Sequence, residues 1–275
     1  MTSTVYHQNK PTFFIVLAML LAARALSASA SPANGSLPHN LQIMPLGDSI
    51  TCGSGGHHGY RGPLGDLLSS VSTNFVFVGS FTDKSLPENE QHHEGHGSYA
   101  IDDIYTNLDG FGDFQFQKWG GESRKPNGGH WFDGIASGPN ARLPLYPNVI
   151  LLLIGANDRD NLEGAQSRLD RLVSKIVTMR PKARLIIARI TPITKSDAYK
   201  DFVGAYNQAV DAVVAKYAPH HLVTEVDLNT GFPSDGLGKD KLHPNDIGYD
   251  WMAKQWYNAI LEAFDTRQSR QRLGL

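Results

Sequence analysis

The sequence contains a single cysteine among its 275 residues, so no disulfide can form within the chain. Stability must therefore come from a packed core, and a chain of this length is long enough to build one. We interpret the one thiol, Cys52, as a small buried side chain rather than a nucleophile, because cysteine is among the residues most often buried in proteins.

A strong charge of either sign is also lacking. The 25 basic residues are balanced by 27 acidic ones, which gives no electrostatic basis for binding nucleic acid or a charged membrane surface. We also find no internal repeat. The apolar content of 41% is ordinary for a globular protein.

Long apolar runs are absent except near the N-terminus. There, Phe13–Ala23 is preceded by Lys10 and followed by Ala28–Ala30, a small-residue sequence typical of a cleavage site. This pattern predicts a secretory signal peptide over residues 1–30 and therefore a secreted, extracellular protein. A membrane anchor is the alternative, but the run is too short to span a bilayer and Arg24 interrupts its end.

Beyond the predicted signal peptide, the sequence indicates a polar leader, one domain and a polar tail, at 31–40, 41–265 and 266–275. Apolar runs predict five strands, at 41–46, 75–78, 149–154, 185–190 and 222–226. Apolar residues at helical spacing predict helices at about 63–71, 99–108, 162–177, 199–217 and 246–264. Strands alternating with helices indicate an α/β fold, with a five-stranded parallel sheet covered on both faces. A long segment rich in Gly and Pro, 110–147, is interpreted as lining a cleft.

Candidate functional residues follow four of the five predicted strands. In a parallel sheet the carboxyl ends of the strands meet at one edge, where ligands bind, so these residues are expected to converge. In chain order they are Ser49 of Gly47-Asp48-Ser49, Gly79, Asn157, and the pair Asp240 and His243. Taken singly, Asn157 could be a helix cap, Gly79 an ordinary turn, and the last pair a solvated loop.

Together these residue types fit nucleophilic catalysis. A serine hydroxyl is a weak nucleophile at neutral pH and needs a base within hydrogen-bond reach, a task suited to histidine. The imidazole in turn needs an acceptor for its other N–H, which Asp240 can supply to His243 from three residues away. The negative oxygen formed on the substrate needs donors already aimed at it. We expect these donors to be the N–H groups of Ser49 and Gly79 and the side-chain amide of Asn157.

This set of residues resembles the SGNH (GDSL-type) hydrolase superfamily. Its four sequence blocks are matched by Gly47–Thr51, Gly79, Gly155–Asp158 and Asp240–His243. Further matches resemble carbohydrate esterase family three, the secreted acetyl xylan esterases. They are Met44–Thr51, Gly59–Arg61, Phe77–Ser80, Glu94–His96 and Leu242–Asn245. This chain has Ala156 where the third block more often has Thr, and Lys241 where the fourth often has Gly.

The resemblance implies a flavodoxin-like three-layer α/β/α fold and a serine esterase that uses neither a cofactor nor a metal. Its implied substrate is an acetylated plant polysaccharide or oligosaccharide such as acetylated xylan. Ser49, His243 and Asp240 would be the catalytic residues. Asp48, Asp158 and Arg61, which lie in or beside the matched blocks, are expected to support the site.

Three alternatives remain at this point. The same triad can serve an esterase or lipase that acts on other acyl esters. A metal-dependent hydrolase is the second, with ligands drawn from His57, His58, His92, His93, Glu94 and His96, although this cluster lacks the His-Glu-x-x-His spacing. The third is a non-catalytic carbohydrate-binding protein with Trp119 and Trp131 as stacking platforms.

Overall fold

The computed structural model describes residues 37–38, 40–56, 58–71, 74–109, 131–132 and 146–265. All of these belong to one compact unit, residues 35–275. The predicted signal peptide, the polar tail, His57, Trp119 and most of the segment 110–147 lie outside the described residues.

The described chain alternates between strands and helices. Its strands are β1 (Leu41–Gly47), β2 (Phe75–Phe77), β3 (Phe81–Thr82), β4 (His92–Gly95), β5 (Val149–Leu153), β6 (Arg184–Arg189) and β7 (Val223–Asp227). Its α-helices are α1 (Ser49–Cys52), α2 (Arg61–Ser70), α3 (Ile101–Asn107), α4 (Ala165–Met179), α5 (Asp197–Tyr217) and α6 (Asp246–Phe264). Short 3₁₀ helices occupy Glu88–Glu90 and Arg159–Asn161.

The five strands predicted from the sequence form a parallel sheet in the order β2-β1-β5-β6-β7. This is the flavodoxin-like order, in which the chain crosses from one side of β1 to the other after β2. β5 lies centrally and all five of its side chains are buried, as its unbroken apolar run predicts. The α/β fold expected from the sequence is therefore confirmed.

Two short strands were not predicted. β4 runs parallel to the second half of β1, pairing Glu94 with Leu46 and Gly95 with Gly47, while β2 pairs with the first half. β3 lies antiparallel to β4. β4 has no apolar pattern, because its buried residues are polar: Glu94 is fully buried and accepts hydrogen bonds from the N–H and Oγ of Ser80.

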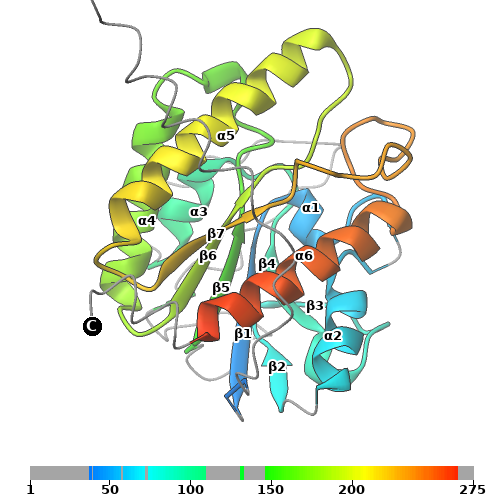
Figure 1. Ribbon diagram of the computed structural model, residues 1–275, viewed down its shortest axis with the longest axis vertical. Coiled ribbons are helices and arrows are strands. Elements are labelled where there is room, and N and C mark those ends of the chain that lie inside the picture. Colours follow the sequence, from blue (N-terminus) through cyan, green and yellow to red (C-terminus); the bar gives the residue numbers. More distant parts are fainter. Residues whose placement is uncertain are drawn as a thin grey trace, which may run out of the picture. The chain divides into compact units, whose positions relative to one another are not determined.

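Helices cover the sheet in two layers. α3, α4 and α5 pack together on one face, and α2 and α6 pack together on the other (Figure 1). α4 shows why: its buried residues recur every three or four positions and face the sheet, among them Leu169, Leu172 and Ile176. The short helix α1 instead stands at the carboxyl end of β1 (Figure 1).

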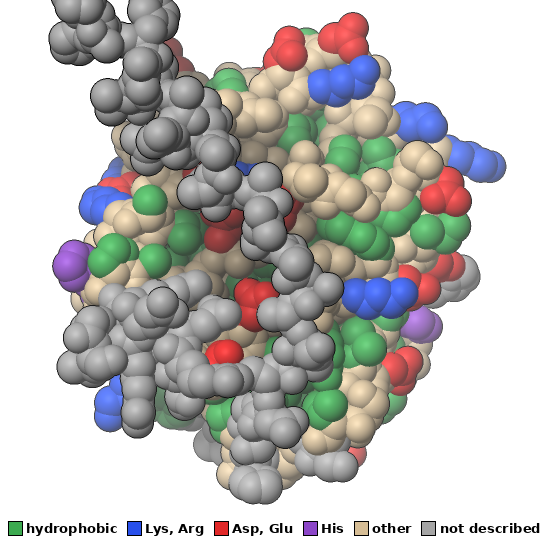
Figure 2. All heavy atoms as spheres, viewed as in Figure 1, with side chains coloured by type: hydrophobic (Ala, Val, Ile, Leu, Met, Phe, Trp, Pro, Cys, Tyr) green, Lys and Arg blue, Asp and Glu red, His purple; other side chains and the backbone are tan. Residues whose placement is uncertain are grey.

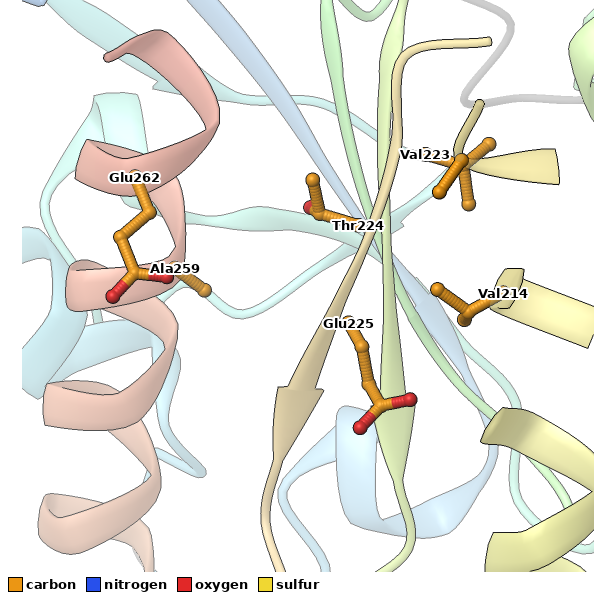
Figure 3. A pocket seen from close by; sticks show the side chains of 7 residues that line it. Val214, Val223, Thr224, Glu225, Ala259 and Glu262 are labelled. Atoms are coloured by element: carbon orange, nitrogen blue, oxygen red, sulfur yellow. The ribbon is translucent and has the colours of Figure 1, made fainter. Parts of the chain in front are cut away.

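A cavity of about 240 Å³ lies beside β7, between α5 and α6. The carboxylates of Glu225 and Glu262 line it from the strand and from α6 (Figure 3). β5 and β6 separate β7 from β1, so this cavity lies away from the end of β1, which leads to Ser49.

Acidic and basic side chains are interspersed over the described part of the face in Figure 2. None of the described helices has both the length and the apolar character needed to cross a membrane.

Gly95 allows α1 to rest directly on β4, which yields a testable prediction. A Cβ at this position would collide with the backbone of Thr51 and Cys52. We therefore expect Gly95→Ala to displace α1, lowering both the free energy of unfolding and any activity that depends on Ser49. The measurements are urea unfolding and ester hydrolysis.

Gly204, in the middle of α5, is the matched control because a Cβ there meets no atom within 4 Å. Gly204→Ala should raise the free energy of unfolding by about 0.5–1 kcal/mol, since glycine weakens a helix interior. Equal behaviour of the two variants would contradict the packing described for Gly95.

Candidate active site

Ser49 is the first residue of α1, directly after β1 ends. Gly47 is paired with Gly95 on one side and with Leu153 on the other, so β1 ends between two neighbouring strands. A side chain at Gly47 would collide with the Leu153 carbonyl. Asp48 then caps the helix, its Oδ1 accepting the N–H of Ile50 at 2.9 Å. This turn leaves Ser49 half-buried at the carboxyl edge of the sheet.

The structure brings Ser49, His243 and Asp240 together in a hydrogen-bonded series. Ser49 Oγ lies 2.8 Å from His243 Nε2, and His243 Nδ1 lies 2.5 Å from Asp240 Oδ2. With the ring proton on Nδ1, where the carboxylate accepts it, Nε2 accepts the serine hydroxyl. The arrangement can therefore remove a proton from Ser49 and hold it on the imidazole.

Asp240 is kept ionised by its surroundings. Partial burial raises the pKa of its carboxyl, but hydrogen bonds from the His243 ring and from the N–H groups of Leu242 and His243 outweigh that effect. The net result is a pKa below the usual value for aspartate. A negative Asp240 beside Nδ1 favours the protonated imidazole that would form during proton transfer.

The loop that carries the pair is a tight turn rather than a helix. His243 O accepts the N–H of Gly238, and the Lys241 carbonyl accepts the N–H of Thr194, which follows β6. Lys241 has a φ of 59°, the left-handed region that favours glycine. This geometry explains why a glycine suits the position that Lys241 occupies here.

The structure does not bring Gly79 to Ser49. β2 ends at Phe77, opposite Ile43 in the first half of β1, and Gly79 packs against the backbone of His93. His93 in turn precedes Glu94, the partner of Leu46. Gly79 therefore lies before the strand end at which Ser49 stands, because β4 and not β2 continues the sheet to that edge.

Ser98 follows β4, the strand that does reach this edge of the sheet. It lies three residues past Gly95, the partner of Gly47, and its φ of 68° is left-handed. Within the described part of the chain its N–H has no hydrogen-bond acceptor. Strained backbone of this kind is concentrated at functional sites. Positive φ is usually signalled in a sequence by glycine. Because residue 98 is a serine, the sequence gives no indication of this conformation.

Asn157 comes four residues after the end of β5 and is exposed. Its Nδ2 donates to the carbonyl of Tyr99 at 2.9 Å, which ties it to the turn containing Ser98. Because the amide nitrogen carries two N–H groups, one remains for a ligand. The carboxyl ends of β1, β4 and β5 thus contribute Ser49, Ser98 and Asn157 to one edge of the sheet.

Two buried carboxyl groups lie beneath this edge. Burial, together with the charge of Asp158, raises the pKa of Asp48 to about 7, although the Ile50 N–H lowers it. Burial raises the pKa of Asp158 to about 6, opposed by the N–H of Ile101 and by Arg168. The supporting roles expected of both residues are thus structural: Asp48 caps α1 and Asp158 anchors the start of α3.

Arg61 is fully buried behind α1. Its Nη1 donates to the carbonyls of Thr51 and Cys52, at 2.7 and 3.2 Å. It therefore contacts the helix that carries Ser49 without itself standing in the triad.

The histidines considered as metal ligands are dispersed among separate partners. His58 contacts Ser85, His92 faces Thr82, His93 accepts the N–H of Gly95, and His96 bonds Glu94. Across the described residues, no three His, Cys, Asp or Glu side chains gather as a metal site would require.

Trp131, considered as a stacking platform for sugars, is buried. Its ring lies 4.6 Å from that of His96, in a stacked arrangement. This is the position of a core residue and not of a surface platform.

Comparison with known proteins identifies relatives of this chain. The model of the GDSL-like Lipase/Acylhydrolase family matches residues 113–251. A multidomain esterase of Ruminococcus flavefaciens is 28% identical over 273 residues, which cover 93% of this chain and 33% of that protein. The chain thus spans about a third of the length of that curated relative.

Solved structures show the same fold. A family 3 carbohydrate esterase of Clostridium thermocellum shares 29% identity with a TM-score of 0.62, covering 82% of this chain and 98% of that one. A carbohydrate esterase family 3 protein of Talaromyces cellulolyticus shares 22% identity, also with a TM-score of 0.62, and with the same coverages.

The raised pKa of Asp48 predicts how stability depends on pH. The Asp48 carboxyl holds its proton more tightly in the folded protein than in the unfolded chain, where its pKa is 3.8. Its contribution to the free energy of unfolding is therefore favourable at low pH and is lost as pH rises towards 7. Asn in its place is neutral throughout. The stability of Asp48→Asn relative to wild type should therefore increase from pH 4 to 7, by at most about 1.4 kcal/mol per pH unit.

Urea unfolding at several pH values measures this difference, with Asp250→Asn as the control at an exposed position of α6. Parallel stability profiles for Asp48→Asn and wild type would show that Asp48 ionises normally in the folded protein.

Proposed function

Because this chain belongs to the GDSL-like lipase/acylhydrolase family, a family of ester hydrolases, we propose that it is a serine esterase with Ser49 as nucleophile. The observation that carries the proposal is the hydrogen-bonded series from Ser49 through His243 to Asp240. His243 Nε2 accepts the hydroxyl proton as Ser49 Oγ bonds to the ester carbonyl carbon. Asp240 stabilises the resulting imidazolium and keeps the ring oriented.

The tetrahedral intermediate places a negative charge on the former carbonyl oxygen. We assign its donors to the N–H of Ser49, the N–H of Ser98 and the second amide N–H of Asn157. Ser49 N–H is at the first position of α1, where a helix leaves its N–H groups without internal partners. Ser98 takes the role expected of Gly79, which lies elsewhere.

Loss of the alcohol completes the first half of the reaction, and water then takes the place of the alcohol in the second half. The intermediate collapses, the alcohol departs with the proton from His243, and the acyl group stays on Ser49 Oγ. His243 then removes a proton from water as the water oxygen attacks the acyl carbon. Collapse of this second intermediate releases the acid and returns the proton to Ser49. Each proton therefore passes through His243: from Ser49 to the leaving alcohol in the first half, and from water to Ser49 in the second.

The substrate we propose is a small acyl ester, acetyl in the first instance, on carbohydrate such as acetylated xylan. Support comes from the 29% identity to the Clostridium thermocellum family 3 carbohydrate esterase over 98% of that chain, and from the sequence resemblance around Ser49 and His243. An esterase acting on longer acyl chains would use the same triad and is the alternative that the assay must separate.

We also propose that the protein is exported, with residues 1–30 removed as a signal peptide. The N-terminal run Phe13–Ala23 and the sequence Ala28–Ala30 support this proposal. The N-terminal residue of exported protein tests it, and Ser31 is the expected result.

The central test is acetate release from acetylated xylan and from a soluble aryl acetate. Wild type is expected to act on both, and Ser49→Ala on neither, because the variant lacks the hydroxyl that His243 deprotonates. Circular dichroism and urea unfolding establish that the variant is folded. Hydrolysis by folded Ser49→Ala at the wild-type rate would refute the assignment of the nucleophile.

The two substrates separate mechanism from specificity. Activity on the aryl acetate alone would keep the mechanism and discard the polysaccharide. Rates on aryl esters of increasing acyl length then determine which acid is preferred. Inactivity of folded wild type on all of them would favour a carbohydrate-binding protein instead.

The oxyanion donors yield a separate prediction. Asn157→Ala should lower kcat by about 10²–10³. Ser98→Val should cause a similar loss, because a β-branched residue strongly disfavours positive φ, whereas Ser98→Gly should retain kcat and stabilise the fold by about 1 kcal/mol.

Asn161→Ala, at an exposed position four residues from Asn157, is the control and should behave as wild type. Full activity of Ser98→Val would exclude the Ser98 N–H as a donor.

A further inference from the structure

The helix that carries Ser49 is too short to hold its own shape. α1 has four residues, and isolated helices shorter than about 12 residues are marginal in water. Its conformation is therefore imposed by neighbouring groups. At its N-terminus Asp48 caps it, and at its C-terminus Gly53, with a φ of 100°, turns the chain away.

Side-chain donors occupy the carbonyls at the C-terminal end of α1. Arg61 Nη1 donates to Thr51 O at 2.7 Å and to Cys52 O at 3.2 Å. The hydroxyl of Tyr249 in α6 lies 2.7 Å from Ser54 O, just past the end of α1, and 3.1 Å from Ile50 O, so its one proton is directed at this end of the helix. Two helices far apart in the sequence, α2 and α6, thus hold the same short turn.

Burial of the charged Arg61 side chain is energetically unfavourable. Its side chain is 1% exposed, and burial lowers the pKa of its guanidinium, although arginine remains charged in proteins. A buried charge destabilises a fold unless it is paired and hydrogen-bonded. Asp83 supplies the carboxylate, 3.3 Å from Nη2, from a position that is 24% exposed. Apolar residues of similar size would fill the same space without this cost, so packing alone does not explain the cation.

We propose that Arg61 is a positioning residue for Ser49: its guanidinium, held by Asp83, fixes the end of α1 and thereby keeps Ser49 Oγ within reach of His243 Nε2. This inference rests on the proposed function. The guanidinium suits the task because its planar fork reaches two backbone carbonyls and a carboxylate at once. A positive charge also interacts favourably with the carbonyl end of a helix.

Lysine cannot reproduce this arrangement. Its ammonium is a single point on a flexible stem, so it keeps the charge and loses the simultaneous contacts. Small misplacements of a reacting group cost up to about 10²-fold in rate. Arg61→Lys therefore separates the geometry of the side chain from its charge.

The test compares Arg61→Lys with Tyr217→Phe in the complete protein. Tyr217 donates to the carbonyl of Asp170, far from α1, so its variant also loses one side-chain bond to a carbonyl. For Arg61→Lys we expect kcat on an aryl acetate to fall by about 10- to 100-fold, with KM within about twofold of wild type. Inactivation by a serine-directed phosphonate should slow in parallel. Tyr217→Phe should keep both rates.

Urea unfolding determines the folded fraction of each variant, so that rates refer to folded protein. A wild-type kcat and inactivation rate in folded Arg61→Lys would overturn the inference. If Arg61→Lys fails to fold, Asp83→Asn replaces it. Asp83 is partly exposed, and its substitution by Asn removes only the negative charge that pairs with Arg61. A lowered kcat with unchanged KM then supports the inference, and an unchanged kcat overturns it.

Failure of the proposed function gives a different result. In that case either folded wild type would be inactive on every ester, or ester hydrolysis would survive Ser49→Ala. Failure of the positioning role alone would leave Ser49 essential and Arg61→Lys fully active.

Discussion

The pairing of Gly47 with Gly95 on one side and with Leu153 on the other determines where the candidate site forms. Three parallel strands, β4, β1 and β5, end level with one another at these residues. Each then passes into a turn, and the three turns deliver Ser98, Ser49 and Asn157 to the same edge. Small residues at Gly47 and Gly95 let the backbones approach closely enough for α1 to sit against β4.

The sequence predicts the parts of the fold that depend on apolar burial. β5 is recognisable from an unbroken apolar run, and α4 from apolar residues at helical spacing, because burial alone decides those patterns. Ser49, Asp240 and His243 are also found from the sequence, because each follows a predicted strand. Their hydrogen-bonded arrangement agrees with the chemistry expected of those residue types.

β4 and Ser98 were missed for different physical reasons. β4 is buried through polar contacts, because Glu94 is hydrogen-bonded to Ser80 and His96. A search for apolar patterns does not predict such a strand. Ser98 has the backbone conformation that a glycine would reveal, but its own residue type gives no sign of it. Glycine is the usual signal and favours Gly79, but β2 pairs with the first half of β1, so Gly79 lies before the strand end at which Ser49 stands.

Residues that break the ordinary rules of burial and backbone conformation gather around α1. Asp48, Asp158, Glu94 and Arg61 are ionisable and buried, and Ser98 and Lys241 have positive φ without being glycine. Each is unfavourable when considered alone. Such conflicts between local preference and overall fold are expected where a protein's function depends on exact placement of polar groups.

The distance along the chain between Ser49 and His243 has a consequence for synthesis. The two side chains that share a hydrogen bond are 194 positions apart. A ribosome-bound chain therefore exposes the serine early but lacks its base until β7 and the following loop have been made. Because Tyr249 of α6 also holds α1, even a chain ending just after His243 lacks a support of the serine. Ser49 therefore meets both its base and its support from α6 only after the chain has been synthesised past these two residues.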